Sequence, residues 1–458
     1  MTLVMKFGGT SVADGKKIKN AARLVNETRK KTGVAVVVSA MSGVTDKLLD
    51  MAKKAHEVEK NEIKNFVEKI RKKHERAAKI AVKENLDSVL DTIYERSEEL
   101  KDALIGVSIT GLTDSGEDSI AAFGEKLSSV ILSGSINDFV ESNWYYGDDG
   151  LIMTSDNFKE AKPYMDAIQR EVDKIILPDI KENKIPVVTG FMGCTADGYT
   201  TTLGRGSSDH IASILGACLN AKEVQIWTDV DGVLTADPKI VKNSRLIYRL
   251  SFKEASELSY FGAKVLHPKS IEPALKKDIP IHILNSFNKD NDGTKITLEA
   301  EKHPDVIKGL SIKKDIVLLD IVSTKMLDAH GFLAKVFEIF KKHKVSVDMI
   351  STTEVSISLT IDNGHTKKIE HIKEELKEIA KVNVFPKKSV LCVVGEGLRH
   401  APGIAGRVCD CLGNADVNLE CISQGASEIS ISFVIDNKDS KKAMTALHKE
   451  FFSGDKNE

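Results

Sequence analysis

The chain has 458 residues, and its 65 lysines and arginines stand against 67 aspartates and glutamates, so its net charge at neutral pH is −2. This length predicts two or three domains, and the balance of charge excludes a protein that holds nucleic acid through a bulk excess of basic residues. The sequence lacks the roughly 20 apolar residues of a membrane-spanning helix and the pattern of a signal peptide, and its six scattered cysteines favour reduced thiols in a cytoplasmic protein.

The first predicted strand is the apolar run Leu3-Val4-Met5, which leads directly into Lys6-Phe7-Gly8-Gly9-Thr10-Ser11. Glycines let backbone N–H groups approach a ligand, and a helix from about Asp14 would add its positive N-terminal end. Lys6 supplies a mobile charge for the same phosphate oxygens. The hexapeptide therefore predicts an anion cradle, although a strand-to-helix turn with a surface lysine would give the same pattern.

Three more runs rich in valine and isoleucine predict buried strands over 34–38, 185–189 and 224–228, and apolar residues recur at helical spacing among charged ones over roughly 46–104. Strands that alternate with helices predict an α/β fold with a largely parallel sheet. Ligands of such sheets bind at the carboxyl ends of the strands. The four strands end in polar or glycine-rich loops at 6–9, 39–43, 190–193 and 228–232, and we expect these loops to form one site.

The segment Gly204-Arg205-Gly206-Ser207-Ser208-Asp209 predicts a glycine-rich loop that opens a helix over 210–219. Arg205 can bind a carboxylate through two parallel hydrogen bonds, and the serines and the helix N-terminus suit an anion. Asp209 could pair with a cation. The alternative is that the serine and aspartate side chains only cap the helix.

Two later segments carry charge beside glycine. The first is Thr228-Asp229-Val230-Asp231-Gly232, which could hold a nucleotide or Mg²⁺ or could form an ordinary Asp-Gly turn. The second contains Lys264, which lies in an apolar segment where a lone lysine commonly extends to solvent. Phosphoryl transfer needs several positive groups around the transferred phosphate, and Lys6, Lys264 and a bound Mg²⁺ would meet that need. His267 precedes a proline, and we interpret it as structural rather than as a general base.

The composition changes near residue 288, and an internal repeat follows Gly309. Residues 331–336 align with 403–408, and residues 354–358 align with 428–432, so a small βαββ module is predicted twice. The repeat carries no obvious nucleophile, base or metal cluster, and Cys409 and Cys411 lack the spacing of a zinc pair. A binding or regulatory role is therefore favoured over catalysis.

These segments together resemble aspartate kinase of the amino-acid kinase superfamily, of the lysine-sensitive monofunctional type, with a C-terminal pair of ACT regulatory modules. The resemblance rests on residues 6–11, 202–209, 227–232 and 261–268, which follow in the family's order and spacing, and on the tandem tail. It implies an amino-acid kinase fold, a three-layer αβα arrangement, over 1–300 and ACT domains over 301–385 and 386–458. No fused second enzyme is expected, because the sequence ends soon after the second ACT copy.

The resemblance implies ATP-dependent phosphorylation of the β-carboxylate of L-aspartate to 4-phospho-L-aspartate, the first step of lysine, threonine and methionine biosynthesis, with ATP and Mg²⁺ required. Lys6, Asp209 and Lys264 would be catalytic, with Lys6 on the transferring phosphate. The nucleotide would contact Lys6, Gly8, Gly9, Thr228, Asp229, Leu234, Lys239, Lys264 and Val265. Aspartate would contact Ser39, Thr45, Glu125, Arg205, Ser208 and Asp209, with Glu125 on its ammonium and Arg205 on a carboxylate.

The sequence departs from the family at a few positions. Ser207 stands where a second glycine is usual, and His210 stands where an aromatic residue is common. Leu234 and Lys239 replace a common tyrosine and arginine, which bears on base stacking and on one phosphate contact.

The first ACT copy resembles the lysine-binding site of lysine-sensitive aspartate kinases through Met326, Phe332, Leu333, Val347, Asp348, Thr353 and Glu354. Asp348 and Glu354 would hold the ammonium groups of lysine, with threonine as another candidate effector, although Ala329 replaces a common serine. The alternative is that both carboxylates are solvated residues at strand ends. Because ACT modules complete their sheets by pairing, a homodimer or higher homo-oligomer is expected.

Two other functions fit parts of the sequence. One is an amino-acid kinase for glutamate or a carbamate-like acid, which the ACT pair disfavours. The other is a catalytically silent amino-acid sensor, which the intact set of Lys6, Glu125, Arg205, Asp209 and Lys264 disfavours. No nucleic-acid or membrane partner is expected.

Overall fold

The computed structural model describes residues 2–204, 206–262, 266, 268–299, 306–327, 330–425 and 429–453. The chain forms two compact units, of which the first comprises Met1–Val233 and Leu266–Glu299 and the second comprises Leu234–Val265 and Ala300–Glu458. The segment Leu234–Val265 thus packs with the tail modules. The domain boundaries at 300 and 385, which follow sequence resemblance rather than packing, stay predictions.

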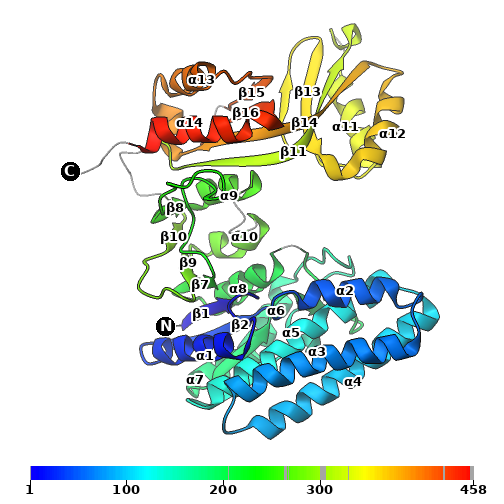
Figure 1. Ribbon diagram of the computed structural model, residues 1–458, viewed down its shortest axis with the longest axis vertical. Coiled ribbons are helices and arrows are strands. Elements are labelled where there is room, and N and C mark those ends of the chain that lie inside the picture. Colours follow the sequence, from blue (N-terminus) through cyan, green and yellow to red (C-terminus); the bar gives the residue numbers. More distant parts are fainter. Residues whose placement is uncertain are drawn as a thin grey trace. The chain divides into compact units, whose positions relative to one another are not determined.

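The first unit is built on a mainly parallel sheet (Figure 1). Its strands run in the order β3 (Ser142–Tyr145), β4 (Ile185–Thr189), β2 (Gly33–Val38), β1 (Thr2–Phe7), β7 (Glu223–Thr228), β9 (Ile281–Asn285) and β10 (Thr294–Thr297). All of these neighbours are parallel except β10, which is antiparallel to β9. The predicted α/β fold is confirmed, and the four predicted strands, β1, β2, β4 and β7, lie side by side in its centre.

Helices cover this sheet in two layers. The helices α1 (Gly15–Arg29) and α5 (Asp114–Asn137) contact β2, and α2 (Val44–Lys54), α3 (Lys60–Ala81) and α4 (Leu86–Thr110) pack on α5. Met5 and Phe7 of β1 belong to the buried core that these helices form. Because side chains alternate along a strand, Lys6 points to the opposite face, where α8 (Ser207–Cys218) contacts β1.

The remaining elements of the first unit are α6 (Met165–Glu171), α7 (Leu177–Lys181), the hairpin of β5 (Met192–Cys194) and β6 (Thr200–Thr202), and α10 (Pro268–Lys276). Asp14 caps α1 by accepting a hydrogen bond from the Lys17 N–H, so the predicted helix start is confirmed. No helix among the described residues is long and apolar enough to cross a membrane.

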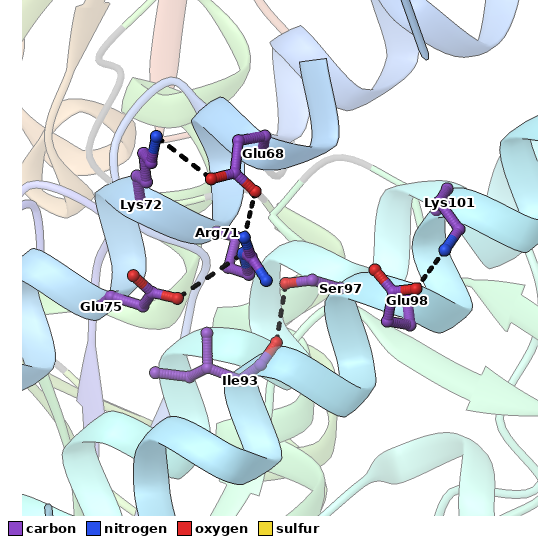
Figure 2. Close-up of polar contacts among 8 residues, drawn as sticks. All are labelled: Glu68, Arg71, Lys72, Glu75, Ile93, Ser97, Glu98 and Lys101. Atoms are coloured by element: carbon purple, nitrogen blue, oxygen red, sulfur yellow. Dashed lines mark hydrogen bonds and ion pairs between the residues drawn. The ribbon is translucent and has the colours of Figure 1, made fainter. Parts of the chain in front are cut away.

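The pair α3 and α4 carries the charged faces that the sequence predicts over 46–104 (Figure 2). Arg71 forms ion pairs with Glu68 and Glu75 on its own helix, and Lys101 pairs with Glu98 on α4. The opposite faces bury apolar residues such as Ile63 and Ile93. These helices are therefore amphipathic, and exposed ion pairs of this kind contribute little to stability.

The second unit contains β8 (Arg249–Ser251), α9 (Phe252–Tyr260) and a sheet of six strands. This sheet has the order β12 (Ile350–Thr352), β13 (Ser356–Asp362), β11 (Gly309–Val322), β14 (Lys381–Val394), β16 (Ser430–Asp436) and β15 (Cys421–Ser423), and all its pairs are antiparallel. The long strands β11 and β14 pair with each other across a register shift between Lys313 and Ile316.

The internal repeat is structural. The helices α11 (Phe332–Lys342) and α13 (Ile404–Asn414) each start after a glycine with left-handed backbone, Gly331 at φ +80° and Gly403 at φ +84°. Each copy also ends in a helix beyond the predicted βαββ pattern, α12 (Thr366–Leu376) and α14 (Ser440–Phe452). Each copy has its own core, and Leu310 on the first half of β11 packs in the core of the second copy.

Candidate functional site

The carboxyl ends of β4, β2, β1 and β7 lie next to one another, because these strands are parallel and adjacent. The four loops that the sequence predicts as a site therefore share one edge of the sheet. Backbone hydrogen bonds link the loops directly: the Ser39 N–H donates to the Phe7 carbonyl, and the Ser42 N–H donates to the Gly9 carbonyl. These two bonds hold the loops after β1 and β2 against each other.

Lys6 forms an ion pair across this edge. Its Nζ lies 2.5 Å from Oδ1 of Asp209, the third residue of α8, and Lys6 is only 8% exposed. The alternative of a surface lysine is therefore wrong. The helix-capping alternative for Asp209 also fails, because the N-cap of α8 is Gly206, at φ +72°, and no side-chain capping bond is found at this N-cap among the described residues.

Close packing requires a glycine at position 9, just after β1. A Cβ atom on Gly9 would lie 2.8 Å from the Ala40 carbonyl oxygen, so a larger residue would push the two loops apart. The Gly8 N–H donates to the Trp227 carbonyl and the Ser11 N–H donates to the Gly8 carbonyl. No backbone acceptor for the N–H groups of Gly9 and Thr10 is found within the described part of the chain, so both groups can bind an anion.

Glu125 is a buried acid on α5, with 3% of its surface exposed. Burial raises the pKa of its carboxyl from 4.5 to about 8, against the smaller lowering effects of the Ala40 N–H and the Lys6 charge. Its Oε2 has no hydrogen-bond partner among the described residues. A buried carboxylate oxygen without a partner is costly to the fold, and it fits a site that a ligand cation completes.

The helix α5 also fixes the neighbouring loop after β2. The Ser128 hydroxyl donates a 2.8 Å hydrogen bond to the Ser39 carbonyl. A Cβ atom on Gly124 would lie 2.7 Å from the Ala40 Cβ and 3.6 Å from Thr45 Oγ1, so the helix touches this loop closely. Ser39 and Thr45 are both partly buried there.

The loop before α8 packs against the end of β4. A Cβ atom on Gly190 would lie 2.5 Å from the Ser208 Oγ, so only glycine allows this approach. The Ser207 hydroxyl donates to the Gly204 carbonyl. The structure brings Lys6, Ser208 and Asp209 to one edge, while Arg205 lies outside the described residues.

The predicted nucleotide residues are only partly described. Thr228 ends β7, its hydroxyl donates to Asp229 Oδ1 at 3.2 Å, and Asp229 is exposed. Lys264, Val265 and His267 lie outside the described residues. Leu234 and Lys239 belong to the second unit, where Leu234 forms a bridge with Leu246 and Lys239 is exposed.

Two residues of this site carry no role in the sequence prediction. Phe191, just after β4, has a left-handed backbone at φ +73°, which is unusual for an aromatic residue, and its carbonyl accepts the Leu203 N–H. Asp118 of α5 is buried and binds Thr202. Only the neighbouring glycines hint at Phe191, and no motif marks Asp118, since both depend on tertiary contacts.

The predicted effector residues lie in the second unit. Asp348 is not solvated, because its carboxylate accepts hydrogen bonds from Lys313 Nζ at 2.6 Å and from the Tyr260 hydroxyl at 2.8 Å. Glu354 is exposed. Phe332 is buried at the start of α11, Met326 and Val347 are partly buried, and Leu333 and Thr353 are exposed. Ala329 lies outside the described residues.

Comparison with known proteins assigns the family. The profile of the amino acid kinase family matches residues 1–285, and that of an ACT domain matches residues 319–374 and 391–451. The chain is 38% identical over 478 residues to aspartokinase 1, chloroplastic, of Arabidopsis thaliana, covering 100% of this chain and 82% of that protein. It is 32% identical over 460 residues to lysine-sensitive aspartokinase 3 of Escherichia coli, covering 98% of this chain and 99% of that protein.

A solved structure agrees with these relatives. The crystal structure of aspartokinase III of E. coli in complex with aspartate and ADP superposes with a TM-score of 0.86 at 30% identity, covering 99% of this chain and 100% of that one. Family profiles, full-length relatives and the fold thus agree over nearly all of the sequence. The chain belongs to the amino acid kinase family and, within it, to the aspartokinases.

Proposed function

We propose that this aspartokinase transfers the γ-phosphoryl group of ATP to the β-carboxylate of L-aspartate, which gives 4-phospho-L-aspartate and ADP. The observation that carries this proposal is a buried edge with Lys6, Asp209 and an unpartnered carboxylate oxygen of Glu125. Such an edge offers a cation for phosphate and an anion for an amino group. The related E. coli enzyme crystallised with aspartate and ADP supports the same pair of ligands.

The substrate carboxylate is already ionised at neutral pH, so its oxygen can attack the γ-phosphorus without a general base. What the protein must supply is alignment of the two substrates and compensation of charge on the phosphoryl oxygens. Lys6 supplies that charge from the end of β1, and the N–H groups of Gly9 and Thr10 supply hydrogen bonds. Asp209 holds the Lys6 ammonium in place until the phosphate arrives.

Glu125 would bind the α-ammonium of aspartate, and Arg205, from the sequence prediction, would bind a carboxylate. Ser39, Thr45 and Ser208 would contribute to the same subsite. Mg²⁺ bound with the nucleotide would neutralise charge on the phosphate oxygens. Mg²⁺ in kinases is held largely by phosphates and water, so it would bind together with the nucleotide.

A direct assay tests the function. Incubation of the purified chain with ATP, Mg²⁺ and aspartate should release ADP, and hydroxylamine should trap the acyl phosphate as aspartyl hydroxamate. Glutamate in place of aspartate should give at least about 10-fold less product, because the extra methylene misplaces the carboxylate. Product with glutamate alone would support the other amino-acid kinase, and no hydroxamate with either acid would support a silent sensor.

We also propose that lysine regulates this enzyme at the first ACT module and stabilises a low-activity state by binding it more tightly. The buried Asp348 carboxylate supports this proposal, since it already binds the ammonium group of Lys313. An effector ammonium that binds Asp348 has to compete with Lys313 for the same oxygen atoms. Threonine has an α-ammonium but no side-chain ammonium, so it could pair with only one of the two acids Asp348 and Glu354.

This competition predicts opposite changes in lysine sensitivity for two substitutions. Asp348→Ala should relieve inhibition by millimolar lysine, whereas Lys313→Met should lower the lysine concentration that gives half inhibition. Asp320→Ala is the matched control, because Asp320 is an acid on β11 that accepts only a 3.2 Å hydrogen bond from Asn383. Full lysine inhibition of Asp348→Ala, or inhibition of the wild type by threonine alone, would contradict the assignment.

The remaining proposals concern assembly and location. We propose a homodimer, since ACT modules commonly pair through their sheets, and a measured mass of one chain in solution would reject it. We further propose that the protein works in a reducing compartment such as the cytoplasm. Its six cysteines are all free thiols, which supports this location.

A further inference from the structure

Asp118 is the most completely bonded acid near the substrate edge, and it is only 2% exposed. Its Oδ2 accepts the Lys159 N–H at 2.9 Å and the Thr202 N–H at 2.8 Å, and its Oδ1 accepts the Thr202 hydroxyl at 2.8 Å. Burial raises the pKa of this carboxyl, and these hydrogen bonds oppose the rise. A buried acid with three donors holds the backbone that provides them.

The two segments that Asp118 joins are strained or closely packed. Lys159 has a left-handed backbone at φ +68°, and its Nζ pairs with Asp114 and Glu117 on the first turns of α5. The Ala161 N–H donates to the Thr202 carbonyl at 3.0 Å. A Cβ atom on Gly204 would lie 3.1 Å from the Lys159 carbonyl oxygen. Residues 159–161 therefore pack against Thr202 and Gly204, which lead into the segment proposed to bind the substrate carboxyl group.

Thr202 is the last residue of β6, three residues before Arg205 and seven before Asp209. Asp118 and Glu125 are also seven residues apart, which on a helix is two turns along one face, or about 10 Å. The same helix therefore carries the carboxylate proposed for the substrate ammonium and the carboxylate that fixes the loop proposed for the substrate carboxyl group.

We propose that Asp118 is a positioning residue that fixes the 202–209 loop at the distance from Glu125 that an amino-dicarboxylic acid spans. The inference rests on the proposed function, because it assigns Asp118 to the amino-acid subsite. Its effect should fall on aspartate and spare the nucleotide, since Asp118 forms its hydrogen bonds with Lys159 and Thr202, whereas the proposed phosphate cradle of Gly9 and Thr10 follows β1.

The test compares two substitutions at one position. Asp118→Ala removes all three hydrogen bonds and should raise the KM for aspartate at least about 10-fold, while the KM for ATP changes less than about twofold. Asp118→Asn keeps one oxygen for both N–H groups, and its amide can donate to the Thr202 hydroxyl, so it should restore the aspartate KM to within about threefold of the wild type. A long-range effect of charge would instead leave Asn as impaired as Ala.

The matched control is Asp179→Ala. Asp179 of α7 is a buried acid of the same unit that accepts hydrogen bonds from Asn143 and the Tyr145 hydroxyl, away from the substrate edge. It should lower the melting temperature without changing either KM. If Asp118→Ala does not fold, Thr202→Val removes only the hydroxyl contact and should raise the aspartate KM about threefold, whereas the neighbouring Thr201→Val should not.

Titration calorimetry with aspartate and with ADP measures the loss of ligand affinity directly, without catalysis. Weaker binding of aspartate alone to Asp118→Ala supports the inference, and equal loss for both ligands, or for neither, overturns it. A wild type that binds aspartate but yields no hydroxamate would reject the proposed reaction and leave the positioning role standing.

Discussion

Replacement of Lys6 by alanine is expected to lower kcat by about 10²-fold or more, with a smaller change in the KM for aspartate. The reason is that Lys6 is proposed to bind the transferred phosphate, where charge develops on the phosphoryl oxygens, and its Nζ lies at the carboxyl edge of the sheet beside Asp209. A group that acts mainly in the transition state changes kcat more than substrate binding. Steady-state ADP release at saturating aspartate and ATP measures the loss.

Lys388→Ala is the matched control for this substitution. Lys388 pairs with Glu420 at 2.5 Å, and its side chain is 12% exposed against 11% for Lys6, but it lies in the second copy of the repeat. Both variants remove a buried ion pair, so both should melt at a lower temperature. Only Lys6→Ala should lose turnover. Near-normal kcat in that variant would show that residues 6–11 form an ordinary turn rather than a phosphate site.

The second large effect is expected from Glu125→Gln, which at about pH 9 should lower kcat/KM for aspartate by about 10²-fold, because at that pH it removes the charge proposed to pair with the substrate ammonium in a buried site. The KM for ATP should change little. Glu223→Gln is the control, since Glu223 is a mostly buried glutamate at the amino end of β7, on the opposite edge of the sheet.

The pH dependence follows from the pKa of about 8 that burial gives Glu125 in the free protein. Below that pH the carboxyl is protonated and cannot pair with an ammonium, so kcat/KM for aspartate should rise as the pH increases from about 6.5 to about 9. The Gln variant should lose this rise. An unchanged profile in Glu125→Gln would show that another group titrates.

The same pKa predicts that Glu125→Gln is more stable to unfolding than the wild type at alkaline pH. In the unfolded chain this carboxyl titrates near 4.5, so between pH 4.5 and about 8 the folded state binds more protons, and stability falls as the pH rises. Glu125→Gln removes that penalty. Its melting temperature should exceed that of the wild type at pH 8.5, with a smaller difference at pH 5, and a lower value at pH 8.5 would contradict the buried-charge argument.

Much of the fold was predictable because its signals are local. Valine-rich runs indicate buried parallel strands, glycine pairs indicate turns at their ends, and Gly331 and Gly403 recur at the same point of each repeat. The topological rule for parallel sheets then places the loops on one edge, which the adjacent order of β4, β2, β1 and β7 confirms. The final helices α12 and α14 escaped prediction because the alignment of the repeat stopped at the last strand.

The sequence by itself determined which residue types stand at the strand ends, and therefore the family and the class of reaction. Only the tertiary structure decided how they work together. Lys6 and Asp209 are 203 positions apart, and their ion pair depends on Lys6 facing α8 rather than α5. Segments that meet only after folding also produce the burial that raises the pKa of Glu125 and the three hydrogen bonds of Asp118. Such long-range contacts produce no periodic pattern in the sequence, so the sequence alone does not predict them.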